Sequence, residues 1–577
     1  MTDYYHSLDR KEIEGVPLGQ IGFSTAPMKD QLDELKAKIR AGISKVELGF
    51  WGKGKGYGEN LTPGTYGSDE RKAIREIAKV NQVELSTHAT PNVGPISGFT
   101  QQGFKEESRK ESVDEIKRAI DFAAEVTEGG PVVMHLGEFV RPIFAAGDRL
   151  EGKDQKNKFQ AYRYAGEKDS EGKLIQHTEE DQATMYLADE KTGQIIDSVK
   201  KDQPIFLPVY ETDDKGKIVF EKEENNNGSK RLVPKIKEKP NGEAEIKQYD
   251  WQEIEQLKDL SNQKNSTSFG TQEWYFQQKI EEKKNEMEGG KAYYQELLDE
   301  KSQFKISKER KKGLKKNIMA TDQKIKEMEL MLSHAKPIET VALAKTSESL
   351  ADLGIHAMEK QKSAKLKKDL YVSPENIFPE QYGGHPDELK KTIQKGRARM
   401  AEKLKDKGWG QESAEEEAKK HIKATFDIGH ANIWRRYFKG TDKEFKGWVM
   451  DKVKDLKKAG VLGHVHVSDN FGYYDEHIDP GKGTAPIKEA VEKLKGEGID
   501  FIVETGRQGE KALLSAFKEF GSPLYGLRSG QFDPWDVVEN SYFGRTSPPY
   551  FLVGEVTQQM GERVSKDFSS WAGIPFE

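Results

Sequence analysis

The sequence contains no cysteine in its 577 residues. This absence excludes disulfide bonds, thiolate zinc sites and cysteine nucleophiles, and it leaves histidine and the carboxylates as the strong metal ligands. No apolar run approaches the ~18 residues of a membrane-spanning helix. The first residues, MTDYYHSLDRKEIEG, lack the basic end and apolar stretch of a secretory leader. We therefore expect a soluble, cytoplasmic protein that makes no contact with a membrane.

Apolar residues are also scarce, because 34% of the chain is hydrophobic and 33% is charged. The length exceeds one ordinary core, so we expect a large domain of about 250 residues or more with additional modules. The low hydrophobic fraction indicates that some segments are solvated and stand away from the core. The net charge of −6 excludes a broad positive field, so any contact with nucleic acid must be local.

Short β-type apolar runs alternate with amphipathic segments in both terminal parts of the chain, which is typical of βα units. Helices are expected near residues 29–41, 68–81 and 107–127. Eight such units close a (β/α)8 TIM barrel, here formed by residues 1–149 and 336–529. An open doubly wound sheet is disfavoured, because the first turn lacks the G-x-G-x-x-G fingerprint. The strand candidates are residues 19–25, 44–50, 83–89, 131–137, 369–376, 423–429, 462–469 and 499–506.

An insertion of different character, residues 150–335, separates the two halves of the predicted barrel. Residues 150–250 contain TMYLADEKTGQIIDSV, PIFLPVYETDDKGKIVFEKE and RLVPKIKEKPNGEAEIKQY, in which polar turns with glycine lie between β-type runs and predict β-hairpins. Residues 251–335 predict a helical hairpin or short coiled coil. Its apolar residues at heptad-like separations are Leu297, Phe304, Ile318, Ile325 and Leu332.

Two interpretations of the helical part stay open. It either engages a protein partner through residues 250–335 or forms a solvated helix pair without a partner. The chain after the barrel, residues 530–577, contains SPPYFLVGE and ends in WAGIPFE. This segment is too apolar for a loose terminus, so we expect it to dock on the rest of the protein.

Polar side chains gather where the predicted strands end, and the active site of a TIM barrel lies at those ends. The carboxylates among them would repel one another and raise each other's pKa, whereas divalent cations would hold them ionised. The number of polar side chains at these strand ends exceeds the number of ligands that one tetrahedral ion takes. We expect two or three divalent ions, with Zn²⁺ favoured and Mn²⁺ as the alternative. The predicted ligands are His88, His135, Glu375, Asp427, His430, His466, Asp475, His477 and Glu504.

The motifs STHATP, VVMHLGE, SPENIFP, FDIGHAN, HVHVSDN, YDEHIDPGKG and VETG, in this order, resemble the xylose-isomerase-like TIM barrels. More narrowly, they resemble the endonuclease IV family (AP endonuclease family 2) of abasic-site nucleases. The resemblance covers about residues 15–145 and 336–525. It implies three ions: one held by His88, His135 and Glu375; a second that Glu375 shares with Asp427, His466 and Glu504; and a third held by His430, Asp475 and His477.

The same resemblance implies an activity. It predicts a phosphodiester hydrolase that cleaves DNA at abasic sites with a hydroxide bridging the metal ions. Glu375, Glu504 and Asp427 would be its catalytic carboxylates. The sequence departs from the family after the first ligand histidine, where HATPNVG replaces a segment that carries a DNA-inserting aromatic residue.

Further residues are predicted to support the site. His464 shares strand parity with His466 but lies one layer deeper, so we expect it behind the ligands or in the core. Asp469 is expected to orient His466. The loop WGKGKGYGENLTPGTYG after the second strand either approaches phosphate and bases or is a mobile loop with packing aromatics. Its candidate substrate-binding residues are Trp51, Lys53, Lys55 and Tyr57.

Two other functions stay open. A sugar isomerase or epimerase of the same superfamily would need one ion and an acid/base pair such as Glu375 and Glu504. A barrel retained as a scaffold would keep its metals for stability while the insertion binds a partner. One metal ion per chain would favour the isomerase, and full metal occupancy without activity would favour the scaffold.

Overall fold

The computed structural model describes residues 21–54, 61–141, 143, 159, 162–168, 174–177, 184–200, 203–224, 230–249, 251–260, 269–270, 272–299, 307–438, 440–494, 498–505 and 516. The predicted residues Lys55, Tyr57 and Phe304 and the predicted docking tail, 530–577, lie outside these ranges. None of the helices in the described ranges has both the length and the apolar character needed to span a bilayer.

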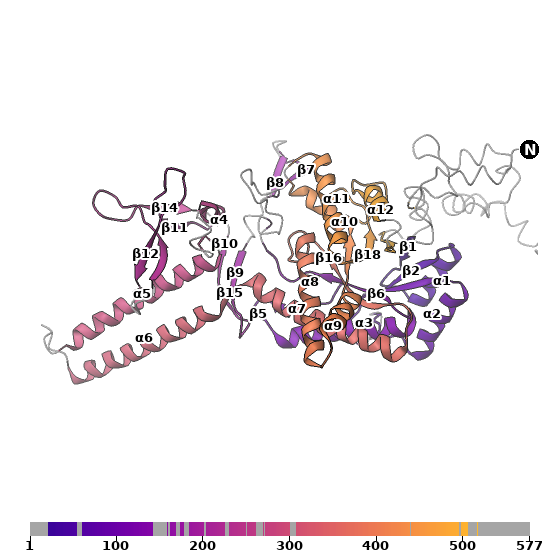
Figure 1. The fold of residues 1–577 in the computed structure, drawn as a ribbon, viewed down its shortest axis with the longest axis horizontal. Helices are drawn as coiled ribbons and strands as arrows, with labels where there is room; N and C mark the ends of the chain where they lie inside the picture. Colours follow the sequence, from indigo (N-terminus) through magenta and orange to yellow (C-terminus); the bar gives the residue numbers. More distant parts are fainter. Residues whose placement is uncertain are drawn as a thin grey trace, which may run out of the picture.

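Eight parallel strands form a closed barrel in the order β1-β19-β18-β17-β16-β6-β3-β2 (Figure 1). Each overlaps one of the eight predicted strands, so the predicted α/β (β/α)8 TIM barrel is confirmed. Strands β6 and β16 join the two halves of the chain through seven residue pairs. The strands are β1 (Ile21–Ser24), β2 (Lys45–Gly49), β3 (Glu84–His88), β6 (Gly130–Leu136), β16 (Leu370–Asn376), β17 (Ala424–Asp427), β18 (Leu462–Val467) and β19 (Asp500–Val503).

Helices surround the barrel, and the three predicted in its first half are confirmed as α1 (Gln31–Arg40), α2 (Ser68–Val80) and α3 (Glu106–Val126). Local chemistry sets their ends: the Asp30 side chain accepts hydrogen bonds from the first amides of α1. The second half adds α7 (Ile338–Ala364), α8 (Pro386–Asp406), α9 (Gln411–His421), α10 (Ile428–Asn432), α11 (Asp442–Lys458) and α12 (Ile487–Leu494). Their apolar faces pack with the strands into one large core.

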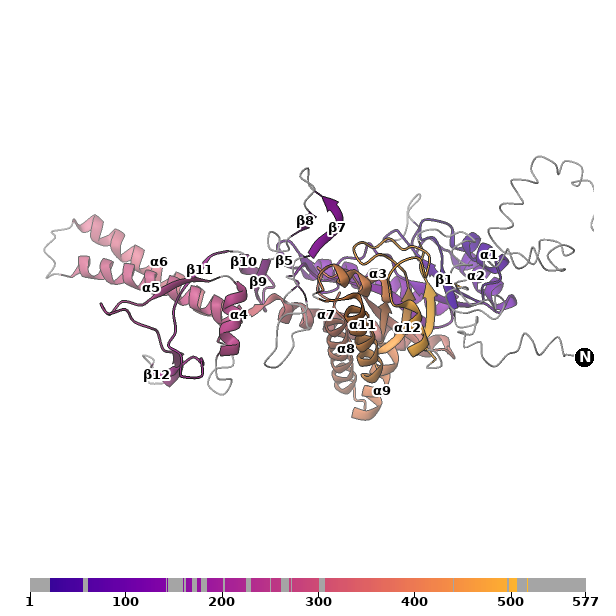
Figure 2. The ribbon, with the colours of Figure 1, turned by 90° about the horizontal axis from the view of Figure 1, so that it is seen from above.

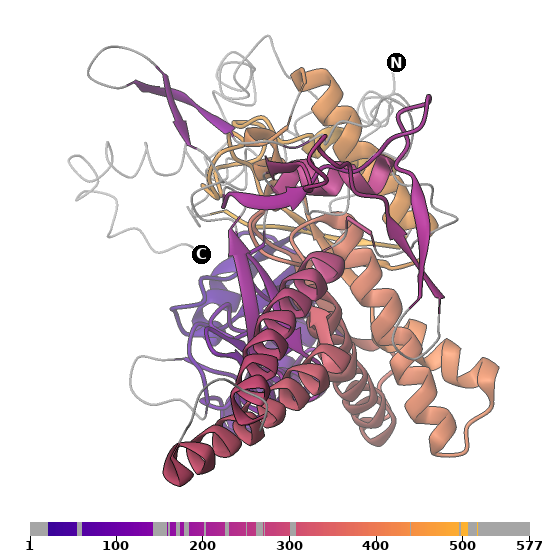
Figure 3. The same cartoon turned by 90° about the vertical axis from the view of Figure 1, so that its left-hand side faces the viewer.

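The insertion contains short β-strands, a small helix and two long helices. Its elements are β7 (Tyr162–Lys168), β8 (Leu174–His177), β9 (Thr184–Asp189), β10 (Ile195–Lys200), β11 (Ile205–Pro208), β12 (Phe220–Glu224), β13 (Lys230–Pro234), β14 (Ile246–Tyr249), α4 (Trp251–Leu260), α5 (Gln272–Leu298), α6 (Lys308–His334) and β15 (Ala335–Pro337). The predicted helical hairpin is α5 and α6, which run antiparallel away from the barrel (Figures 1 and 2). The view from the insertion side shows the two helices side by side (Figure 3).

The first predicted hairpin of the insertion is confirmed by the antiparallel pairing of β9 with β10. The other two need correction: β11 pairs with β14 and β12 pairs with β13. Their predicted turns are nevertheless present, because Thr212 bridges to Ile218 and Glu238 bridges to Ala244. The two segments therefore cross-pair with each other over a core of their own.

The insertion returns to the barrel beside the place where it leaves. Strand β15 pairs with β9, with Asp189 opposite Ala335. A short hairpin of the barrel, β4 (Phe99–Thr100) and β5 (Gly103–Phe104), contacts this junction through a hydrogen bond from Phe104 N to Gly193 O of 2.8 Å. An apolar cluster that includes Phe139 and Tyr382 packs underneath.

Candidate metal centre

The carboxyl ends of the barrel strands bring together all nine predicted ligands. His88 and Asp427 are the last residues of β3 and β17, and Glu504 directly follows β19. His135 and Glu375 are paired in register on β6 and β16. His430 lies on α10, which begins as soon as β17 ends, and Asp475 and His477 lie in the loop after β18. Because the strands are parallel, these positions share one rim of the barrel.

Five groups of histidine and carboxylate side chains have ligand atoms within 4.8 Å of one another. Two of them are His88, His466 and Glu504, and Glu47, His464 and His466. The other three coincide with the sets that the resemblance implies, and we call them the first, second and third donor groups. These three groups are His88, His135 and Glu375; Glu375, Asp427, His466 and Glu504; and His430, Asp475 and His477.

The spacing of the donor atoms fits divalent cations. Two atoms that each lie about 2.1 Å from one tetrahedral ion are about 3.4 Å apart. Glu375 Oε2 lies 3.4 Å from His88 Nε2 and 3.7 Å from His135 Nε2. Asp475 Oδ2 lies 3.4 Å from His430 Nε2 and 3.0 Å from His477 Nε2. Two buried oxygens, Glu375 Oε2 and Asp475 Oδ1, accept no hydrogen bond within the described part of the chain, which is the situation that a bound cation resolves.

Hydrogen bonds behind the histidines decide which nitrogen faces the site. The ring of His88 lies with Nδ1 2.6 Å from the Ala89 carbonyl, and the ring of His430 with Nδ1 2.9 Å from the Asn376 carbonyl. A carbonyl oxygen accepts a hydrogen bond and cannot donate one, so both rings carry their proton on Nδ1 in the neutral form and present Nε2 as the ligand nitrogen.

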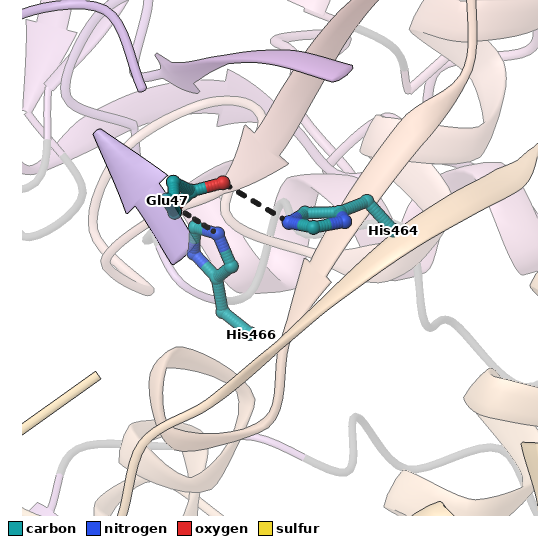
Figure 4. A group of neighbouring side chains, drawn as sticks. All are labelled: Glu47, His464 and His466. Carbon is teal, nitrogen blue, oxygen red and sulfur yellow. Dashed lines mark hydrogen bonds and ion pairs between the residues drawn. The ribbon is translucent and has the colours of Figure 1, made fainter. Parts of the chain in front are cut away.

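A buried carboxylate that the sequence analysis missed, Glu47 on β2, has the same role behind His466 (Figure 4). Its Oε1 lies 2.9 Å from His466 Nε2 and its Oε2 lies 3.1 Å from His464 Nε2. The other nitrogen of His466, Nδ1, is thereby left facing Glu375 Oε1 at 3.0 Å and Glu504 Oε1 at 3.4 Å. The signal in the sequence was a lone acidic residue inside the apolar strand SKVELGF.

His464 lies where it was expected, fully buried one layer below the ligands. It contacts Glu47, so it fixes the carboxylate that fixes His466. Burial opposes ionisation of Glu47, but the two histidines hold its pKa below the usual range. The three residues therefore form one connected support under the second donor group.

The expected role of Asp469 needs correction. Its carboxylate accepts backbone N–H groups of Asn470, Gly481 and Gly483 at 2.9 Å and of Ala485 at 3.1 Å. It therefore organises the loop that carries Asp475 and His477, instead of orienting His466. It lies three positions after His466, and side chains at an odd spacing point to opposite sides of an extended chain.

Ser468, which the sequence analysis did not single out, supports a ligand directly. Its hydroxyl lies 2.8 and 3.0 Å from the two carboxylate oxygens of Asp427. Asp427 also accepts the backbone N–H of His430 at 2.6 Å, which starts α10. This contact fixes the third donor group relative to the second.

When no cation is bound, protonated histidines balance the negative charge of the carboxylates. Burial opposes the charged form of His88, but the contact with Glu375 and the other nearby carboxylates raise its pKa to about 9. Burial is likewise outweighed at His477, where Asp475 raises the pKa to about 9. Burial lowers the pKa of His135 to about 3. Cation binding would therefore displace protons from histidines such as His88 and His477.

The loop after β2 lies at the same rim. Trp51 is 40% exposed, and its carbonyl accepts hydrogen bonds from Thr90 Oγ1 and Asn92 Nδ2, each at 2.8 Å. Thr90 and Asn92 thus hold the backbone of Trp51 in place. Lys53 is exposed nearby in the chain.

The fold and this site define a TIM barrel with a histidine–carboxylate centre suited to several divalent cations. No protein-family model matches the chain. An uncharacterized protein of Methanocaldococcus jannaschii is 40% identical over 85 residues, which are 15% of this chain and 25% of that protein. The chain therefore aligns with about a quarter of the length of this relative.

Solved structures of sugar epimerases show a distant similarity. A D-tagatose 3-epimerase-like protein has 14% identity and a TM-score of 0.37, with 87% of this chain and 96% of that chain covered. D-psicose 3-epimerase with D-tagatose from Clostridium cellulolyticum H10 has 8% identity and a TM-score of 0.34, with coverage of 88% and 96%. D-psicose 3-epimerase in the presence of D-fructose has 10% identity and a TM-score of 0.32, with coverage of 85% and 86%. Similarity of this degree bears on neither substrate nor reaction.

Proposed function

We propose that the chain is a metal-dependent phosphodiester hydrolase that holds three divalent cations, with Zn²⁺ favoured and Mn²⁺ as the alternative. The observation that carries this proposal is the third donor group, His430, Asp475 and His477. A sugar isomerase that uses one ion has no need of these three residues. Phosphodiester hydrolysis does, because charge develops on both the attacking and the leaving oxygen of the phosphate.

Two carboxylates connect the three groups. Glu375 directs one oxygen towards His88 and His135 and the other towards His466. Glu504 directs Oε1 towards His466 at 3.4 Å and Oε2 towards His477 at 4.0 Å. When bound, the cations lower the pKa of a coordinated water and neutralise charge on the phosphate. The chain itself supplies the rigid spacing between the groups.

The exposure of the donors indicates where a substrate enters. Glu375 and His466 are fully buried, whereas the side chains of His135 and His477 are 26% and 24% exposed. The first and third groups therefore face solvent, and Glu375 lies at the floor between them. Trp51 and Lys53 at the same rim offer an aromatic face and a cation, which suit a nucleotide. We propose DNA with an abasic site as the substrate.

Metal analysis and a nicking assay on the purified chain test the proposal. We expect three ions per chain and nicking of an abasic duplex that a chelator stops. Glu375→Gln should abolish nicking and lower the metal content, because it weakens two donor groups at once. Glu138→Gln is the matched control: Glu138 is equally buried, lies outside the groups, and burial raises its pKa, so glutamine is a close substitute. Full activity of Glu375→Gln would refute the proposal.

A second candidate is a metal-dependent sugar isomerase or epimerase. Its specific support is the approach of Glu375 and Glu504 to the same nitrogen of His466, at 3.0 and 3.4 Å. Two carboxylates around one ion can exchange a proton with the carbon beside a carbonyl. One ion per chain, together with deuterium uptake from solvent into a ketose, would favour this candidate over the hydrolase.

A further inference from the structure

The two long helices of the insertion extend beyond any core. Buried residues of the insertion's core end at Ile280 on α5 and begin again only at the C-terminal part of α6. We call residues 281–298 of α5 and 308–324 of α6 the arm. At 1.5 Å per residue it projects about 25 Å from that core, and two perpendicular views show it pointing away from the barrel (Figures 1 and 2).

Basic residues are concentrated at the tip of the arm. Six of the nine residues from 308 to 316 are Lys or Arg, and one, Glu309, is acidic. This is a sharp local excess in a chain whose net charge is −6. Five of the six, which we call the lysine stripe, are Lys308, Lys311, Lys312, Lys315 and Lys316.

The lysine stripe occupies one face of α6. Its members follow the spacing i, i+3, i+4, i+7 and i+8, which places them above one another on a helix. Leu314 is the buried residue of this stretch, and all five lysines are exposed. Lower on the arm the lysines are paired, Lys284 with Glu329 and Lys291 with Asp322, each at 2.5 Å. Within the described residues no ion pair is recorded for the stripe.

This arrangement opposes the stability of the helix in two ways. Cations in the first turns of a helix face the positive end of its dipole. Like charges three and four residues apart repel each other as well. Glu309 in the first turn and the Ser307 hydroxyl, which accepts the backbone N–H of Arg310 at 3.3 Å, offset part of the first effect. Within the described residues no ion pair offsets the second. A ligand with densely spaced negative charges would remove both.

We propose that the lysine stripe binds the phosphodiester backbone of nucleic acid. The stripe covers about 12 Å of helix axis, a length over which duplex DNA presents about seven phosphates. A membrane surface is disfavoured, because amphipathic membrane helices expose a row of large apolar residues beside their lysines. Here Leu314 is buried, and Met319 is a single exposed large apolar residue next to the stripe. The ion pair of Lys291 with Asp322 sets the alignment of the two helices and places exposed Tyr293 opposite residue 320. Tyr293 therefore lies about one helical turn from the stripe.

The lysine stripe is a surface separate from the metal centre. This inference deepens the proposed function, since the stripe would supply a second contact to a nucleic-acid substrate. Binding at the stripe does not depend on hydrolysis. A duplex without a lesion, studied by fluorescence anisotropy, reports binding alone. The failure of this inference and the failure of the proposed function are therefore distinguishable.

The test uses the full chain with all five lysines of the stripe changed to glutamine. Its control changes five exposed lysines outside the arm to glutamine, which gives the same net charge: Lys72, Lys79, Lys405, Lys443 and Lys458. From about 50 to 200 mM salt, the slope of log affinity against log salt should become shallower by about four in the stripe variant and by less than one in the control. Affinity at the lowest salt should fall by tenfold or more in the stripe variant only.

Two further measurements complete the test. Circular dichroism of both variants should match the parent chain, and a stripe variant with five Lys→Arg changes should keep its affinity, because charge alone is required. DNA and RNA both have a phosphodiester backbone. The affinities for DNA and RNA duplexes of equal length show which of the two the stripe binds more tightly. Equal salt slopes in the stripe and control variants would overturn the proposal. So would a stripe variant that binds nucleic acid normally but no longer binds vesicles of phosphatidylserine and phosphatidylcholine.

Discussion

At the scale of single residues, the centre depends on a carboxylate that touches none of the exposed donors. The carboxylate of Glu47 contacts Nε2 of His466 and Nε2 of His464, and Glu47 is itself fully buried. Carboxylates in this position fix the tautomer and orientation of a ligand histidine and increase its basicity. The second donor group therefore relies on a residue of a strand that contributes no donor of its own.

Glu47→Gln tests this dependence. Glutamine accepts through one atom only, so one of the two histidines loses its acceptor. We expect metal affinity at the second donor group to fall by about 10–100-fold, measured by competition with a chromophoric chelator. Glu138→Gln should leave the affinity unchanged. An unchanged affinity in Glu47→Gln, with its loss of thermal stability no larger than that of the control, would contradict the assigned role.

The sequence was sufficient to predict the nine donors but not Glu47. The donors could be predicted because the carboxyl ends of parallel strands always share one rim, so His88, Asp427 and Glu504 needed only correct strand ends. Glu47 lies inside a strand. Which side chains it meets depends on how β2 and β18 are staggered around the closed barrel, and no local pattern records that stagger. Asp469 was assigned wrongly for a similar reason, since its partners lie in a loop without regular periodicity.

At the scale of elements, α7 is held between α3 and α8 by a chain of ion pairs. Asp352 of α7 contacts Arg109 of α3 at 3.5 Å and Lys403 of α8 at 2.5 Å. Glu348 of α7 contacts Arg399 at 2.6 Å and also Lys403. Helix α7 is the first element after the insertion, so these pairs attach the second half of the barrel to the first.

The charge of Glu348 should make this attachment dependent on pH. Burial works against its ionisation, but Lys403 and Arg399 lower its pKa below the ordinary value of a glutamate. A carboxylate whose folded pKa is depressed stabilises the fold above its unfolded pKa, and the contribution is lost as pH falls through the folded pKa. Glu348→Gln should therefore lower Tm by about 1–3 °C at neutral pH, and the difference should shrink as the pH falls below the unfolded pKa of glutamate, about 4.3. Exposed Glu416→Gln on α9 is the control; an equal difference at all pH values would refute the assignment.

Turn positions in the insertion could be predicted, whereas strand partners could not. The turn near Asp213 follows from local chemistry, because its carboxylate accepts the amides of Lys215 and Lys217 at 2.9 and 2.8 Å. The partner of each strand is decided by which apolar faces reach the shared core around Trp251 and Phe269. That choice is a long-range effect, so β11 pairs with β14 although the sequence favours its nearest neighbour.

At the scale of the whole molecule, the metal centre joins the two parts of the chain that the insertion separates. His88 and His135 come from the first part and Glu375 from the second, and all three belong to one donor group. A ligand bound only by the folded state stabilises it by about 2.7 kcal/mol at a free concentration of 100 Kd. Removal of metal with a chelator should therefore lower Tm, measured by differential scanning calorimetry. Glu375→Gln should show a much smaller effect of the chelator, and an equal effect would indicate that the metal stabilises some other part of the chain.

The pairing of Asp189 with Ala335 has a consequence for how such a protein can diversify. The two ends of the intervening sequence are held side by side by this pairing, and the barrel also meets that sequence near Gly193. Substitutions in the arm, beyond both contacts, should therefore leave the spacing of His135 and Glu375 unchanged. The rim that carries the donors and the projecting helices can thus acquire substitutions independently.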